Sequence, residues 1–141
     1  FSWGVPTAWV ASGGTWNLGV LCIYIGTVFW VIGYDTIYGC QDMSEDKIFG
    51  VKNAAITTEK YLSNFIKFTY FASVLFFCFA GFYLNLHLGW FLGLFLMSMH
   101  LFLQTKKIKK IDRELSLKIF ISNKVAGLFL VMGSMSKFLY F

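Results

Sequence analysis

The longest uncharged stretch of the chain places the strongest constraint on its fold. Residues 68–105 contain no Lys, Arg, Asp or Glu. One helix of that length would reach about 57 Å at 1.5 Å per residue, almost twice the roughly 30 Å of hydrocarbon in a bilayer. The stretch therefore predicts two membrane spans joined by a turn. The polar break at Asn85, His87 and Gly89 marks that turn.

A second uncharged stretch covers residues 1–34. Residues 1–11 are too short to cross the membrane and are interpreted as the tail of a further span, which ends at a Ser-Gly-Gly turn at 12–14. A first complete span is then predicted at about 16–40, and three more at about 61–83, 89–105 and 119–140. Gly19, Gly26 and Gly33 recur every seven residues in the first span, a strip on which a neighbouring helix can pack closely.

These spans predict an all-α, polytopic transmembrane bundle of about four complete spans plus the tail of a fifth. A composition of 57% hydrophobic and 13% charged residues excludes an ordinary soluble domain and a disordered chain. The whole of 1–141 is treated as a single transmembrane domain. Because it begins at Phe1, inside an apolar segment and without Met, we expect it to be a fragment.

The basic residues give the bundle an orientation. Most of them fall in two predicted loops, 41–60 and 104–118, whereas the turns at 12–15 and 84–89 have none. By the positive-inside rule the two charged loops lie on the cytoplasmic side or its equivalent. The net charge of +5 is thus assigned to lipid headgroups and anionic substrates, and nucleic acid is not expected as a partner. The loop residues are Lys47, Lys52, Lys60, Lys106, Lys107, Lys109, Lys110, Arg113 and Lys118.

Three aspartates follow the first complete span, in the sequence YDTIYGCQDMSED at 34–46. In a continuous helix, Asp42 and Asp46 would lie within about 20° of Asp35 on one face, and Tyr38 would join that face. A carboxylate within a membrane span costs roughly 2.5–3.5 kcal/mol on insertion scales, so a carboxylate that directly adjoins a span marks a candidate functional site. The bland alternative is a solvated helix end.

Several carboxylates on one face need cations to remain ionised together, and oxygen ligands with open positions suit Mg²⁺. Lysines in the adjoining loop can take the charge of a polyphosphate. The combination favours an enzyme that holds a lipid diphosphate, with its head in the loop and its tail among the helices. Two other classes stay open: a cation or proton transporter with a carboxylate relay, and a non-catalytic membrane subunit.

The same residues resemble a known family. YDTIYGCQDMSED followed by GVKNAAI is similar to the second aspartate-rich motif of the UbiA superfamily of intramembrane prenyltransferases, most closely its 4-hydroxybenzoate polyprenyltransferase branch. FSWGVPTAW and DRELSLKIFISNKVAGLFL resemble other segments of that branch. The resemblance implies the C-terminal part of an all-α fold of about nine helices. It implies a bacterial inner membrane or the mitochondrial inner membrane, with the aspartate loop on the cytoplasmic or matrix side.

The resemblance also implies a reaction, the Mg²⁺-dependent transfer of a polyprenyl group from a polyprenyl diphosphate to the ring of 4-hydroxybenzoate in ubiquinone biosynthesis. Another aromatic acceptor is the nearest alternative. Departures are small: Gly39 stands where the branch more often has Ala, and Asn53-Ala54 where it often has Ser-Thr. The family's first aspartate-rich motif is absent from these residues, so we expect the 141-residue chain alone to be inactive.

Roles for individual residues follow from the resemblance. Asp35, Asp42 and Asp46 would be Mg²⁺ ligands or carboxylates next to them, with Asp35 and Asp42 counted as catalytic. Tyr38 would orient a carboxylate or face the allylic cation. Lys52 and Lys47 would contact the diphosphate. Asn123 and Lys124 are further candidates for that contact by their position alone, because they begin the predicted last span on the charged side. Lys124 is more simply a lysine that extends to the interface.

Overall fold

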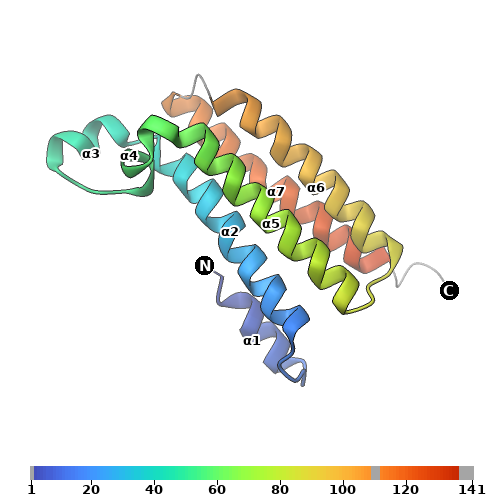
Figure 1. Ribbon diagram of the computed structural model, residues 1–141. Coiled ribbons are helices and arrows are strands. Elements are labelled where there is room, and N and C mark those ends of the chain that lie inside the picture. The colour runs from blue at the N-terminus through green and yellow to red at the C-terminus, as the bar shows by residue number, and fades with distance from the viewer. Residues whose placement is uncertain (1, 109–111, 137–141) are drawn as a thin grey trace.

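The computed structural model describes residues 2–108 and 112–136, and all regular structure in these ranges is helical. Four helices are long and apolar enough to cross a membrane: α2 (Leu18–Gly39), α5 (Leu62–Tyr83), α6 (Leu88–Lys107) and α7 (Arg113–Met135) (Figure 1). The predicted all-α, polytopic bundle is therefore confirmed. Lys109, Lys110 and the end of the predicted last span, 137–140, lie outside the described residues.

The helices differ from the predicted spans mainly at the charged end. Helix α7 begins at Arg113, six positions before the predicted start, because the Asp112 carboxylate accepts a hydrogen bond from the Leu115 amide at 2.7 Å and caps the helix. The predicted loop 41–60 is also partly helical. It contains α3 (Met43–Phe49), α4 (Ala54–Thr57) and the 3₁₀ turn η1 (Glu59–Tyr61).

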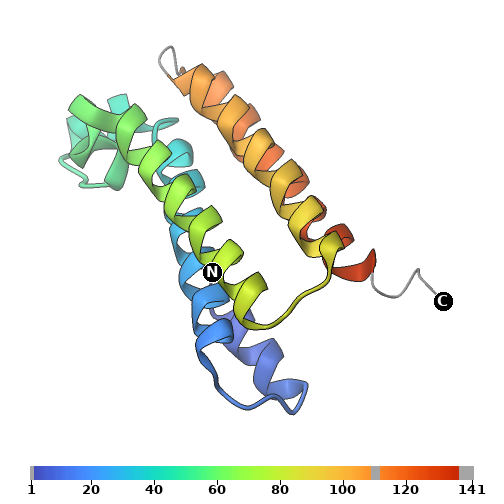
Figure 2. The same cartoon turned by 45° about the vertical axis from the view of Figure 1, so that its right-hand side comes forward.

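The long helices form two antiparallel pairs. Helix α2 packs along α5 and α6 packs along α7, and the pairs meet through α5 with α6 and α2 with α7 (Figures 1 and 2). Helix α1 (Gly4–Ala11) lies beside the start of α2. Helices α3 and α4 project from the end of the bundle where α2 finishes (Figure 1). The described charged segments of the chain thus lie at one end of the bundle.

Glycines set the spacing of both pairs. The predicted strip on α2 is confirmed: a Cβ on Gly33 would lie 2.5 Å from the Tyr70 ring, and Gly19 and Gly26 face Leu84 and Phe77 in the same way. The α6–α7 pair uses the same device, since a Cβ on Gly93 would lie 2.4 Å from the Phe129 carbonyl oxygen and 3.0 Å from Gly133 Cα. Small residues allow this approach where lipid supplies no hydrophobic drive between helices.

A buried polar network joins all four long helices. Asn123 on α7 accepts a hydrogen bond from the Trp30 indole of α2 at 3.0 Å, and the Tyr70 hydroxyl of α5 lies 3.5 Å from the same oxygen. Tyr70 donates to Gln104 of α6 at 3.0 Å, and Gln104 donates in turn to Ser122 of α7 at 2.8 Å. Asn123, considered above as a diphosphate contact, is instead buried among these partners.

Replacing Asn123 by alanine is expected to destabilise the bundle by about 1–2 kcal/mol. The Trp30 indole loses its hydrogen-bond acceptor, and the Tyr70 hydroxyl loses one of its two nearby acceptors. Reversible unfolding in mixed micelles measures the change. The exposed Asn64→Ala on α5 is the matched control and should shift stability by less than about 0.5 kcal/mol. Equal shifts in the two variants would show that the Asn123 network contributes nothing of its own.

Candidate active site

The three aspartates do not share one helix face. Helix α2 ends at Gly39, the chain turns at residues 40–42, and Asp42 stands at the start of the separate helix α3, which contains Asp46. The prediction of a single face is therefore wrong, because it assumed one continuous helix through Gly39, a residue that destabilises helix interiors. Asp35 is exposed on α2. Among the described residues, no group of three or more Asp, Glu, His or Cys is placed to hold a metal ion.

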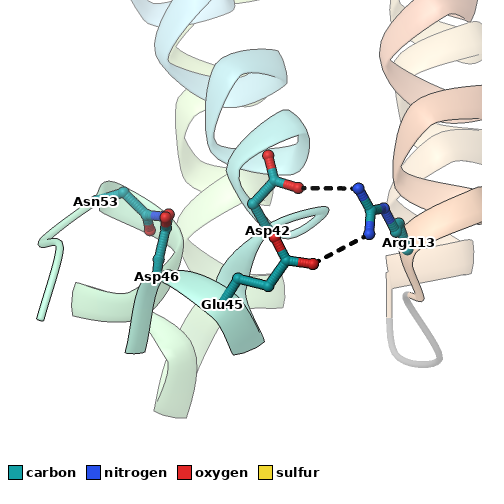
Figure 3. Close-up of polar contacts among 5 residues, drawn as sticks. All are labelled: Asp42, Glu45, Asp46, Asn53 and Arg113. Atoms are coloured by element: carbon teal, nitrogen blue, oxygen red, sulfur yellow. Dashed lines mark hydrogen bonds and ion pairs between the residues drawn. The ribbon is translucent and has the colours of Figure 1, made fainter. Parts of the chain in front are cut away.

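An arginine at the start of α7 forms ion pairs with two carboxylates at the start of α3. Arg113, the first residue of α7, lies 3.7 Å from the Asp42 carboxylate and 3.2 Å from that of Glu45 (Figure 3). Sequence reasoning missed this bridge, because Arg113 and Glu45 are 68 positions apart. All three side chains are more than a third exposed, and such pairs contribute about 0.2–1 kcal/mol each. The bridge therefore adds little to the stability of the fold.

Asn53 connects α3 to α4. Its amide nitrogen donates to the Asp46 carboxylate at 2.6 Å, and its amide oxygen accepts from the Ile56 backbone N–H at 2.8 Å (Figure 3 shows the first contact). Asn53 thereby caps α4 and holds Asp46 with one side chain. The sequence signal for this role was present, because Asn is among the preferred capping residues.

The two lysines proposed for the diphosphate differ in whether a carboxylate already pairs with them. Lys47 forms an ion pair with Glu59 at 2.6 Å. Lys52 is exposed in the segment between α3 and α4, and no carboxylate of the described ranges lies within 4.0 Å of its amine. Lys52 is therefore the lysine whose charge is available to an anion.

An aromatic groove lies between α2 and α7, with a volume of about 500 Å³. Trp30 and Tyr34 line it from α2, and Phe120 and Lys124 from α7. The Phe120 ring lies 5.7 Å from Tyr34 and 4.8 Å from Tyr38, measured between ring centroids. Tyr38 thus packs against Phe120 at the groove rather than against a carboxylate. Phe120 was missed from sequence, where it was one of 17 phenylalanines without a distinguishing signal.

The fold and site define an integral membrane protein with carboxylates, lysines and an arginine at one end of its spans and an aromatic groove below them. The model of the UbiA prenyltransferase family matches residues 1–132. The chain belongs to this family.

Curated relatives agree with the family assignment. The 4-hydroxybenzoate octaprenyltransferase of Pseudomonas putida (strain GB-1) is 34% identical over 134 residues, which are 94% of this chain and 45% of that protein. Proteins of the same name from Pasteurella multocida and Acinetobacter baylyi are 31% and 30% identical, covering 90% and 98% of this chain and 44% and 48% of their own lengths. The chain spans about half the length of these relatives. No solved structure matches it significantly.

Replacing Asn53 by alanine is expected to speed hydrogen exchange of the Ile56 amide about fivefold, because a helix cap of about 1 kcal/mol is removed. Asn53→Asp retains a capping oxygen and should leave that amide protected, while it places a second carboxylate against Asp46. Mass spectrometry of exchanged peptides makes the comparison. Equal exchange at Ile56 in both variants would contradict the capping role.

Proposed function

We propose that this protein acts in the Mg²⁺-dependent transfer of a polyprenyl group from a polyprenyl diphosphate to the ring of 4-hydroxybenzoate or a related aromatic acceptor. The observation that carries the proposal is the similarity, over 94% of the chain, to a protein named 4-hydroxybenzoate octaprenyltransferase. The placement of α3, α4 and the aromatic groove at neighbouring positions supports it, since a charged head and an apolar tail need adjoining sites.

The aspartates fit Mg²⁺ in chemistry but are not gathered for it. Carboxylate oxygens are the ligands that Mg²⁺ prefers, yet Asp35, Asp42 and Asp46 form no group of three, and Asp42 lies beside Arg113. We infer that these aspartates would hold metal together with the first aspartate-rich motif of the family, which this sequence lacks. The metal, when bound, would neutralise the departing diphosphate.

The side chains of this chain would divide the remaining work. Lys52 would bind the diphosphate, and Lys47 would join it after releasing Glu59. As the allylic carbon–oxygen bond breaks, negative charge grows on the diphosphate. The positively charged ammonium groups of the two lysines would stabilise that charge. The ring faces of Tyr34, Tyr38 and Phe120 would stabilise the allylic cation until the acceptor ring attacks it through the carbon next to its hydroxyl. That carbon would then lose its proton to the released diphosphate, which restores the aromatic ring.

The aromatic groove would also protect the cation from water. Its described lining from α2 and α7 is mostly apolar or aromatic, with Thr27, Asn123 and Lys124 as exceptions. The Thr27 hydroxyl donates to a carbonyl oxygen of its own helix, and the Asn123 amide is engaged in the interhelical network. A groove of this kind disfavours hydrolysis of a reactive cation. The bacterial sources of the named relatives favour a bacterial inner membrane, with the α3–α4 end on the cytoplasmic side.

Replacing Asp42 by asparagine is expected to lower Mg²⁺-dependent transfer of a labelled prenyl group at least 100-fold, an order of magnitude typical for loss of one charge-stabilising group. The assay uses membranes carrying the protein at its full natural length, with and without a chelator. Asp112→Asn makes the same chemical change at the α7 cap, where Asn caps as well as Asp, and should retain activity. Full activity in Asp42→Asn would refute the assigned role.

The 141-residue chain alone, reconstituted in liposomes with Mg²⁺, is expected to give no turnover, because its described residues do not gather a metal site of three groups. The measurement is the same transfer of a labelled prenyl group to 4-hydroxybenzoate, with membranes from the full-length protein as the positive control. Turnover by the short chain at a comparable rate would overturn this expectation.

A further inference from the structure

A second groove lies on the opposite side of the bundle from the aromatic groove. It runs between α5 and α6, whereas the aromatic groove runs between α2 and α7. Figure 2 shows α5 and α6 running side by side from the turn that joins them toward the charged end. The groove has a volume of about 340 Å³. None of the residues assigned above to metal or diphosphate lines it.

The groove is mostly apolar, although Ser98 also lines it. Phe71 and Phe102 form its edges and are 63% and 58% exposed, while Leu101 is buried at its floor. The Thr105 hydroxyl, which also lines it, donates to the carbonyl oxygen of Phe102 in its own helix. The walls therefore present hydrocarbon and aromatic surface, which suits an acyl chain.

Two lysines mark the charged end of the groove. Lys67, near the start of α5, lines it, and the Lys106 amine, near the end of α6, lies 4.7 Å from the centre of the Phe102 ring. Both are exposed, and within residues 2–108 and 112–136 neither has a carboxylate within 4.0 Å. Two uncompensated positive charges above an apolar groove complement a phosphate above an acyl chain.

A neighbouring groove shows why the α5–α6 groove is preferred. Lys107 and Lys118 line a smaller groove, of about 250 Å³, between α6 and α7. There Lys118 pairs with Glu114 at 2.5 Å, so one of the two positive charges is already offset. Its lining also includes the polar side chains His100, Gln104 and Ser122. That groove therefore lacks the free charge pair, and its lining is more polar than that of the α5–α6 groove.

We propose that the α5–α6 groove binds one anionic phospholipid of the membrane, with its phosphate between Lys67 and Lys106 and an acyl chain along Phe71, Val74 and Phe102. Basic pockets between spans on the cytoplasmic side attract the anionic lipids of that leaflet. The site is separate from the proposed transferase chemistry, so it stands or falls independently of that function.

Native mass spectrometry of the full-length protein in detergent tests the site. Phosphatidylglycerol should be retained more strongly than phosphatidylcholine with the same acyl chains. The double variant Lys67→Gln, Lys106→Gln should weaken phosphatidylglycerol binding about 30-fold, since each lysine near a membrane surface contributes roughly fivefold, and should leave phosphatidylcholine unchanged. Inorganic phosphate, which lacks acyl chains, should not displace the lipid.

The matched control is Lys107→Gln, Lys118→Gln, which removes the same charge from the α6–α7 groove and should leave phosphatidylglycerol binding within about twofold of the original protein. Ser98→Phe places a ring in the α5–α6 groove without changing charge and should lower retention of both lipids. Circular dichroism checks that each variant is folded. Equal losses in the two double variants, unchanged binding in the first, or displacement by inorganic phosphate would overturn the proposal.

Discussion

The structure depends on one constraint, that a polar group inside a bilayer must find its partner within the protein. Asn123 shows how this chain meets it. The Asn123 side-chain amide on α7 accepts a hydrogen bond from the Trp30 indole of α2 and lies near the Tyr70 hydroxyl of α5. Tyr70 in turn donates a hydrogen bond to Gln104 of α6. The network fixes which faces of the four helices meet. The glycines then decide how closely they meet, since Gly33 and Gly93 leave no space for a side chain.

The charged end follows from the arrangement of the helices. Because α2 and α7 are neighbours, Arg113 at the start of α7 reaches Asp42 and Glu45, which directly follow α2. The same neighbours form the aromatic groove, so the candidate head-binding and tail-binding regions share two helices. The groove is lined by α2 between Thr27 and Tyr34 and by α7 between Phe120 and Lys124, in the halves of these helices nearer the charged end.

The carboxylates at this end are held in ways that compete with a metal. Arg113 lies beside Asp42, and Asn53 donates to Asp46. An exposed guanidinium pair is weak, so a divalent ion with its higher charge can displace it at small cost. Asn53 is different, because its amide also caps α4 and its loss would loosen the segment that carries Lys52. At the charged end, Arg113 is thus a partner of Asp42 that a metal ion can replace, whereas Asn53 is a partner of Asp46 with a structural role.

The sequence by itself determined the class of the protein, the four apolar helices and the family, because an uncharged run longer than one bilayer crossing permits few folds and the aspartate motif is specific. It also determined that Gly19, Gly26 and Gly33 pack against a neighbour, since helical periodicity is a local property. Tertiary structure alone decided that Arg113 meets Glu45 and that Phe120 joins Tyr38. These contacts join residues up to 82 positions apart, and no local pattern specifies which helix faces pack together.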